Sequence, residues 1–135
     1  MSSMWSQLGP ELWPAFWLTI KLTLWSALGS MILGTILTAM RVSPVGILRF
    51  LATTYITIVR NTPLTLVVLF CSFGLYQTLG VTLASRESAT FLIDNNVRLA
   101  IVGFILYTSA FVAESLRSGI NTVDFGQAEA ARSLG

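Results

Sequence analysis

Three long apolar stretches, separated by short polar segments, divide this chain of 135 residues. The first runs from about residue 14 to residue 40, the second from about 50 to 79, and the third from about 96 to 116. A helix rises about 1.5 Å per residue and the hydrocarbon core of a bilayer is about 30 Å thick, so each stretch is long enough to cross it. The pattern predicts an all-α membrane protein with three transmembrane helices.

The composition supports a multi-pass protein of a cell membrane and narrows the chemistry. Hydrophobic residues make up 54% of the chain and charged residues 10%, whereas soluble domains have about 25% charged residues. The absence of His and the single Cys71 exclude a disulfide framework and a His-based metal or acid–base site. A net charge of +2 does not indicate nucleic-acid binding. No phosphate loop or activated nucleophile is found, so we predict no enzyme, no metal and no cofactor.

Basic residues set the predicted orientation, because Lys and Arg concentrate in cytoplasmic loops. One side of the membrane would hold four of them: Arg41, Arg49, Arg117 and Arg132. The loop on the other side contains only Arg86, although Lys21 and Arg98 lie near the helix ends on that side. The distribution predicts that the N-terminus lies outside the cell.

The first span has two marked features. Three tryptophans at its entry fit an aromatic belt at the membrane surface: Trp5, Trp13 and Trp17. Small residues then recur at every fourth position: Ser26, Ser30, Gly34 and Thr38. Such spacing lets helices pack closely in lipid, but Gly and Ser are also common in membrane helices that have no such contact.

The second span is interrupted by Arg60-Asn61-Thr62-Pro63. Proline removes a helical donor and disfavours helical geometry at the preceding residue, so we expect a kink or an unwound segment. Arg60 follows Arg49 by about 16 Å of helix, which puts it near mid-bilayer, where an arginine must face protein or water. A position of Arg60 on a transport path would explain an arginine at this depth. The alternatives are a structural ion pair, for example with Glu114, or a position nearer the membrane surface.

The third span presents a small and polar face at helical spacing. Its members are Ala100, Gly103, Tyr107, Ala110, Glu114 and Arg117. We expect this face to point into a helix bundle, with Asp94, Asn95 and Asn96 capping the helix start. Glu114 and Arg117 lie one turn apart, and a structural ion pair between them is favoured over a substrate contact. Cys71, in an apolar run, is interpreted as a small buried hydrophobe.

A polar, alanine-rich segment at about residues 124–135 follows the last span. Asp124 and Gln127 have the spacing of a capping box, and the alanines that follow favour a helix. Such a surface helix is either a docking element for a partner or an amphipathic cytoplasmic loop.

These motifs resemble a known family. Glu129-Ala130-Ala131, with Gly135 four residues beyond, resembles the EAA motif of ATP-binding-cassette importer permeases. The wider run that begins at Glu114-x-x-Arg117 and continues through Gly126-Gln127 resembles the polar amino-acid branch, the histidine, glutamine and glutamate permeases. Arg60-Asn61-Thr62-Pro63 resembles the RGTP motif of that branch. The stretch from Asn61 to Phe70 is most similar to glutamate-uptake permeases. Three positions depart from the family pattern: Asn61 and Ser118 replace Gly, and Asp124 replaces Pro.

The resemblance implies a permease core of five transmembrane helices, of which this chain contains three. We therefore expect the chain to be a partial transmembrane domain that does not transport alone. The translocation path would include Arg60, Asn61, Thr62, Pro63 and Tyr107. A coupling helix would dock on a cytoplasmic ATP-binding subunit through Gly126, Gln127, Glu129, Ala130, Ala131 and Gly135. The further partners implied are a second permease subunit, an extracytoplasmic solute-binding protein, an amino-acid substrate and membrane lipid.

The predicted function is thus the permease subunit of an ATP-driven amino-acid importer, with glutamate as the expected substrate. A small membrane protein that scaffolds or regulates an assembly without transporting is the alternative. A secondary transporter would need an ion-coupling site, and the acids in or near the spans all lie close to helix ends: Glu11, Asp94 and Glu114.

Overall fold

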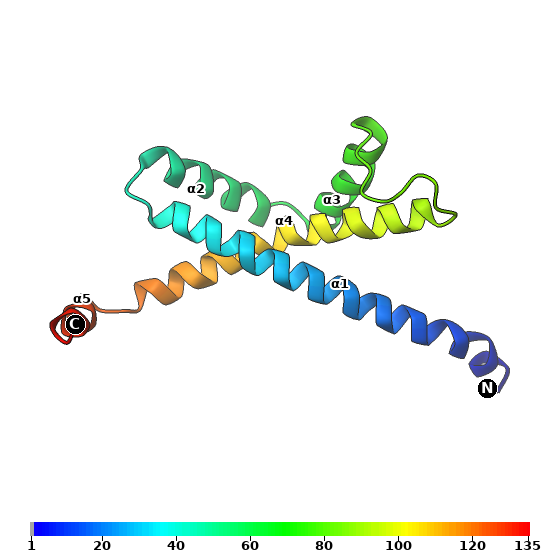
Figure 1. The fold of residues 1–135 in the computed structure, drawn as a ribbon, viewed down its shortest axis with the longest axis horizontal. Coiled ribbons are helices and arrows are strands. Elements are labelled where there is room, and N and C mark those ends of the chain that lie inside the picture. The colour runs from blue at the N-terminus through cyan, green and yellow to red at the C-terminus, as the bar shows by residue number, and fades with distance from the viewer. Residues whose placement is uncertain (1) are drawn as a thin grey trace.

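The computed structural model describes residues 2–135 and is built from helices joined by short connections (Figure 1). In chain order the elements are α1 (Ser2–Val42), α2 (Gly46–Arg60), α3 (Leu64–Leu69), the π-helix η1 (Phe70–Thr78), α4 (Phe91–Asn121) and α5 (Phe125–Ser133). No strand occurs among these described residues, which confirms the predicted all-α class. α1 and α4 are each long and apolar enough to cross a membrane, and a third crossing exists only if α2 with α3–η1 counts as one bent span.

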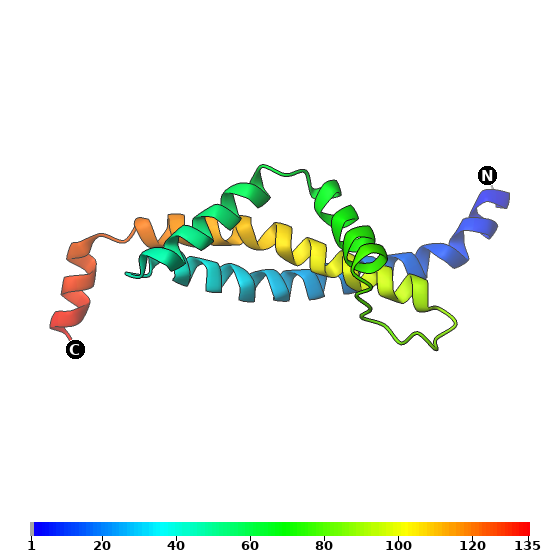
Figure 2. The same cartoon turned by 90° about the horizontal axis from the view of Figure 1, so that it is seen from above.

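α1 is longer than the predicted first span, since it begins at Ser2 and ends at Val42. Its 41 residues would extend about 62 Å, roughly twice the thickness of a hydrocarbon core. Pro10 and Pro14 lie inside its first third, and Figure 2 shows that α1 bends near its N-terminal end. The prolines therefore accompany a bend of the helix rather than its end, as expected where a proline removes one helical hydrogen bond.

α1 and α4 cross at the centre of the molecule (Figure 1) and pack through the small residues of α1. Ser30, Gly34 and Thr38 are all buried, so the predicted packing face is confirmed. A Cβ atom placed on Gly34 would lie 2.5 Å from Cγ1 of Val112 and 3.1 Å from the carbonyl oxygen of Ser109. Thr38 Oγ1 lies 2.8 Å from the carbonyl oxygen of Gly34 and 3.3 Å from that of Ala113 on α4. Close approach of the backbones is what small residues permit in membrane helices.

α2 packs against both of these helices and completes a small core. The core residues come from all three helices: Leu37, Ala52, Ile56, Ala110 and Ala113. Tyr55 lies beside them and donates a hydrogen bond of 2.6 Å from its hydroxyl to the carbonyl oxygen of Leu106. This bond fixes α2 to the middle of α4.

The second apolar stretch forms two arms rather than one rod. The chain bends by 107° between α2 and the α3–η1 segment, and Figure 2 shows them as an inverted V beside the α1–α4 pair, with the break at its apex. The second arm packs on α4, where Cys71 is fully buried next to Gly103. The interpretation of Cys71 as a small buried hydrophobe is confirmed.

α4 begins at Phe91, earlier than the predicted start near residue 96. The N-cap position belongs to Thr90, so the prediction that Asp94, Asn95 and Asn96 cap this helix was wrong. Asp94 lies in the first turn and accepts a hydrogen bond of 2.7 Å from the Thr90 hydroxyl. Asn95 is buried and accepts a bond of 2.8 Å from the Leu83 backbone N–H. These polar residues therefore hold the preceding loop against the helix.

Candidate functional site

The predicted interruption of the second span is present at residues 61–63. Arg60 is the last residue of α2, and Pro63 occupies the N-cap position of α3. Thr62 donates a 2.8 Å hydrogen bond from its hydroxyl back to the carbonyl oxygen of Ile58. Asn61 has φ −91° and ψ 0°, so this turn does not use the positive φ for which Gly would be favoured. Asn in place of the usual Gly is accommodated without strain.

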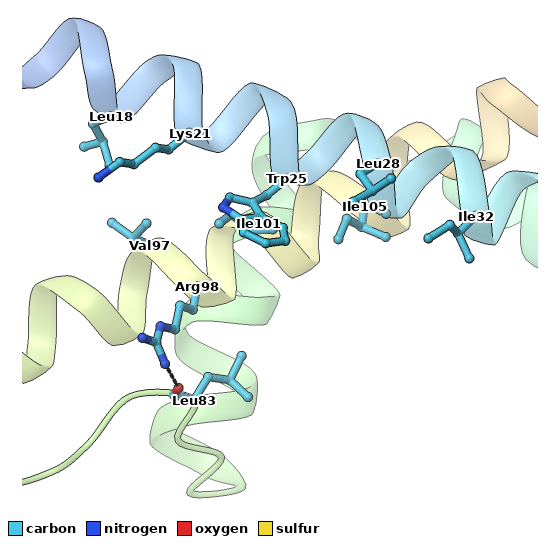
Figure 3. Close-up of a pocket in the computed structure, with 11 residues that line it drawn as sticks. Leu18, Lys21, Trp25, Leu28, Ile32, Leu83, Val97, Arg98, Ile101 and Ile105 are labelled. Atoms are coloured by element: carbon cyan, nitrogen blue, oxygen red, sulfur yellow. Dashed lines mark hydrogen bonds between the residues drawn. The ribbon is translucent and has the colours of Figure 1, made fainter.

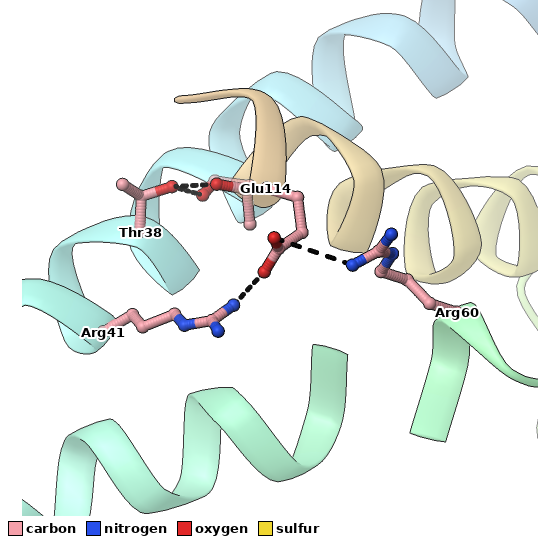
Figure 4. A network of polar contacts seen from close by, with 6 residues as sticks. Thr38, Arg41, Arg60 and Glu114 are labelled. Atoms are coloured by element: carbon pink, nitrogen blue, oxygen red, sulfur yellow. Dashed lines mark hydrogen bonds and ion pairs between the residues drawn. The ribbon is translucent and has the colours of Figure 1, made fainter. Parts of the chain in front are cut away.

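Three charged side chains from three helices meet beside this break (Figure 4). Glu114 of α4 forms an ion pair through Oε1 with Arg41 of α1, and its Oε2 lies 3.6 Å from Nη1 of Arg60 of α2. The Arg41 and Glu114 side chains are 17% and 26% exposed, whereas Arg60 is 45% exposed. The cluster has two positive charges and one negative charge, so its net charge is +1. Of the two arginines, Arg60 is the more exposed and has the longer contact with Glu114.

This network corrects one expectation and bears out another. The predicted pair between Glu114 and Arg117 does not form within residues 2–135, because Arg41 reaches the Glu114 carboxylate from the neighbouring helix. Arg60 reaches the second oxygen of the same carboxylate, so the ion pair with Glu114 that was named as an alternative for Arg60 is present. The depth of Arg60 in a membrane stays a prediction.

An aromatic pair extends the site along α4. The guanidinium of Arg60 lies 5.7 Å from the ring centroid of Phe111, within the range of cation–π attraction. The Phe111 ring lies 5.0 Å from that of Tyr107. Two residues predicted from different spans, Arg60 and Tyr107, are thus connected through one intervening side chain.

Sequence reasoning did not identify Arg41 or Phe111 as part of this site. Arg41 was used only as a loop charge for orientation. Its position one residue before the end of α1 did not show that it would reach Glu114 on α4. Phe111 lies one helical turn from Tyr107, and nothing in its type or spacing separated it from the other apolar residues of α4.

The terminal helix α5 stands apart from the rest of the molecule. It extends from the end of α4 (Figures 1 and 2) and packs against no other element of the described chain. Phe125 and Leu134, at its two ends, are each 90% exposed. Asp124 takes the N-cap backbone conformation, but its side chain makes no capping hydrogen bond. The expected helix is present, and the side-chain part of the predicted capping box is not.

The predicted coupling residues all lie on or next to this helix. They are Gly126, Gln127, Glu129, Ala130, Ala131 and Gly135. All six are exposed. Gly135 has φ +94°, a left-handed conformation that favours glycine.

Comparison of the sequence and the structure with known proteins indicates the function of this chain. No family model matches the chain. Over all of its 135 residues the chain is 78% identical to the glutamate transport system permease protein GluC of Corynebacterium glutamicum. The chain is a relative of amino-acid ABC transporter permeases. It is also 36% identical, over 118 residues and 87% of its length, to the arginine transport system permease protein ArtQ of Bacillus subtilis. The chain spans 59% of the length of the first relative and 49% of the second.

A solved structure extends the likeness to the fold. The crystal structure of an amino acid ABC transporter with histidines matches 87% of this chain and 49% of its own, with a TM-score of 0.69 and 32% sequence identity. Together with the apolar helices α1 and α4, these relationships identify a multi-pass membrane protein.

Proposed function

We propose that this chain forms part of the permease subunit of an ATP-driven importer, and that the substrate is an amino acid, most specifically glutamate. The observation that carries the proposal is the 78% identity to a glutamate permease along the entire chain. ATP would be bound and hydrolysed by a separate cytoplasmic subunit. A second permease subunit and an extracytoplasmic solute-binding protein would complete the assembly, with the N-terminus of this chain outside the cell.

The charged cluster supports an anionic amino acid as the substrate. Arg41 engages Glu114 tightly, while Arg60 is held by a longer contact of 3.6 Å and remains partly exposed. Arg60 is therefore available to bind a carboxylate with the two-pronged geometry of a guanidinium. In this proposal Arg41 acts as a positioning residue, because it neutralises Glu114 and leaves the charge of Arg60 unbalanced.

The break next to Arg60 supports a place on the translocation path. Transporters form their substrate sites at discontinuous helices, whose freed backbone groups are available to ligands. Asn61 and Pro63 are exposed at the apex of the two arms, and Thr62 is half-buried beneath them. In the proposed path these three residues and Arg60 line one side, and Tyr107 on α4 lines the other.

The isolation of α5 supports its assignment as the coupling helix. A helix that packs on nothing within its own chain and exposes Phe125 and Leu134 at its ends needs a partner to cover those apolar side chains. We assign that partner as the cytoplasmic ATPase. Glu129 and Ala130 would enter its cleft, and Gly126, Gln127, Ala131 and Gly135 would form the rest of the contact surface.

A chimera tests the proposal directly. In it, this chain replaces the matching part of the C. glutamicum permease, which supplies the remainder of that protein, in a strain that lacks its own copy. The proposal predicts uptake of labelled glutamate, reduced by excess unlabelled glutamate and not by excess arginine. Competition by arginine alone would reassign the substrate. A chimera that inserts and binds the ATPase but takes up no amino acid would indicate a scaffold instead.

A further inference from the structure

An apolar groove of about 680 Å³ lies between the middle of α1 and the first half of α4 (Figure 3). Most of its lining is aliphatic or aromatic, and the side chains come from both helices and from the loop before α4. The main apolar contributors are Trp25, Leu28, Ile32, Val97, Ile101 and Ile105. The translocation site described above uses none of them.

Two cations, Lys21 and Arg98, line the same groove, and no carboxylate does. Figure 3 shows that the Lys21 side chain extends from α1 toward Leu18, and that Arg98 projects from α4 toward the loop at Leu83. Arg98 donates one hydrogen bond to the carbonyl oxygen of Leu83, which leaves most of its five N–H groups free for another acceptor. Neither cation forms an ion pair within residues 2–135. The groove thus combines an apolar floor with a positively charged mouth.

The depth of these residues matches one leaflet of a bilayer. Trp13, Phe16 and Trp17 form a stacked and edge-to-face cluster on α1, and such aromatic clusters prefer the membrane surface. Lys21 follows one turn deeper, and Ile32 lies about 16 Å beyond Lys21 along the helix. Half of a hydrocarbon core is about 15 Å. The groove therefore runs from the headgroup level to near the bilayer centre.

We propose that this groove is a binding site for an anionic phospholipid. The phosphate lies between Lys21 and Arg98, and one acyl chain lies along Trp25, Leu28 and Ile32. The charge pattern favours an anionic phospholipid, because the two cations lie at the headgroup level, where such a lipid carries its phosphate, and the apolar lining continues to the depth of its acyl chain. The site requires only that α1 and α4 span a membrane and does not depend on the transport function.

Trp25 provides the probe. In a variant with Trp5, Trp13 and Trp17 each changed to Phe, Trp25 is the only fluorophore of its kind. The variant is placed in phosphatidylcholine vesicles that contain either dibrominated phosphatidylglycerol or dibrominated phosphatidylcholine, and quenching gives the relative affinity for each lipid. One near-surface Lys or Arg strengthens anionic-lipid binding by about fivefold, so two cations predict a preference for phosphatidylglycerol of about fivefold to twenty-five-fold.

Matched variants separate this site from general attraction to the membrane. Lys21→Gln with Arg98→Gln should abolish the preference, and Lys21→Arg with Arg98→Lys, which keeps both charges, should retain it. Arg86→Gln, which removes an exposed loop charge elsewhere, should leave it unchanged. Equal quenching by the two lipids in the unsubstituted groove would overturn the proposal, as would a preference that survives loss of both charges. Loss of Trp25 quenching in the full-length chimera would also overturn it, because a protein segment would then occupy the groove.

Discussion

Replacing Gly34 with alanine tests the close contact between α1 and α4. The added Cβ atom would lie 2.5 Å and 2.8 Å from Cγ1 and Cβ of Val112 and 3.1 Å from the carbonyl oxygen of Ser109. Unstrained carbon atoms are separated by about 3.5–4.0 Å. The two helices must therefore move apart locally, which weakens the packing along their common face.

The expected magnitude is the difference between two effects. Alanine in place of glycine in a helix interior stabilises by about 1 kcal/mol, whereas overpacking a well-packed contact costs about 1–3 kcal/mol. Gly34→Ala should therefore lower the free energy of unfolding by up to about 2 kcal/mol. Gly119→Ala on α4, where an added Cβ meets nothing within 4 Å, should raise it by about 1 kcal/mol. The difference between the two variants isolates the steric cost, since the helix propensity cancels.

The assay is unfolding of the 135-residue chain in mixed detergent micelles, followed by helical circular dichroism as the fraction of dodecyl sulfate rises. Val112→Ala provides the coupling test, because it removes Cγ1, the atom nearest to the new Cβ, and leaves Cβ of residue 112 and the carbonyl oxygen of Ser109 in place. In that background Gly34→Ala should be less destabilising than in the unsubstituted chain, with a coupling energy above the additivity error of about 0.5 kcal/mol. Equal effects of Gly34→Ala and Gly119→Ala would refute the close approach of α1 and α4.

Two further predictions concern Tyr55 and the helix α5. Tyr55→Phe should lower the free energy of unfolding by about 0.6–1.5 kcal/mol, because its bond to the carbonyl oxygen of Leu106 is lost, whereas Tyr76→Phe should have little effect in the same titration. In the chimera, Glu129→Lys or Gly135→Asp should abolish substrate-stimulated ATP hydrolysis without reducing membrane insertion, and unchanged hydrolysis in both would remove α5 from the coupling role.

Helix-forming and helix-breaking signals along the chain were sufficient to predict much of the fold. The four-residue repeat from Ser26 to Thr38 indicated a possible close helix contact, which the structure shows, and Pro63 predicted the break, because both effects are local to one segment. Helix ends were less predictable. α4 starts at Phe91, with Thr90 as its N-cap, and Asp94 and Asn95 bind Thr90 and Leu83 of the preceding loop. No local pattern indicated whether the helix would begin before or after these two residues.

The ion network could not be predicted for a different reason. Glu114 and Arg117 satisfy the spacing rule for a pair on one helix, but the carboxylate meets Arg41 and Arg60 from two other helices. Which arginine reaches a carboxylate depends on how the helices cross, and that is decided by packing residues such as Gly34 rather than by the charged residues themselves. The charge of Arg60 within an apolar stretch indicated its importance and Glu114 as a possible partner, and the structure adds Arg41 and Phe111.

The most direct test of the account is the effect of Arg60 on uptake per assembled transporter in the chimera with its ATPase. Because Glu114 keeps Arg41 when Arg60 is lost, Arg60→Lys and Arg60→Ala should both assemble in normal yield. Arg60→Lys should transport glutamate poorly, since it lacks the planar fork, and Arg60→Ala should transport even less. Arg41→Ala is the matched control and should lower the yield, because it removes the tight partner of a partly buried carboxylate. Normal uptake per assembled transporter in Arg60→Ala would contradict the account.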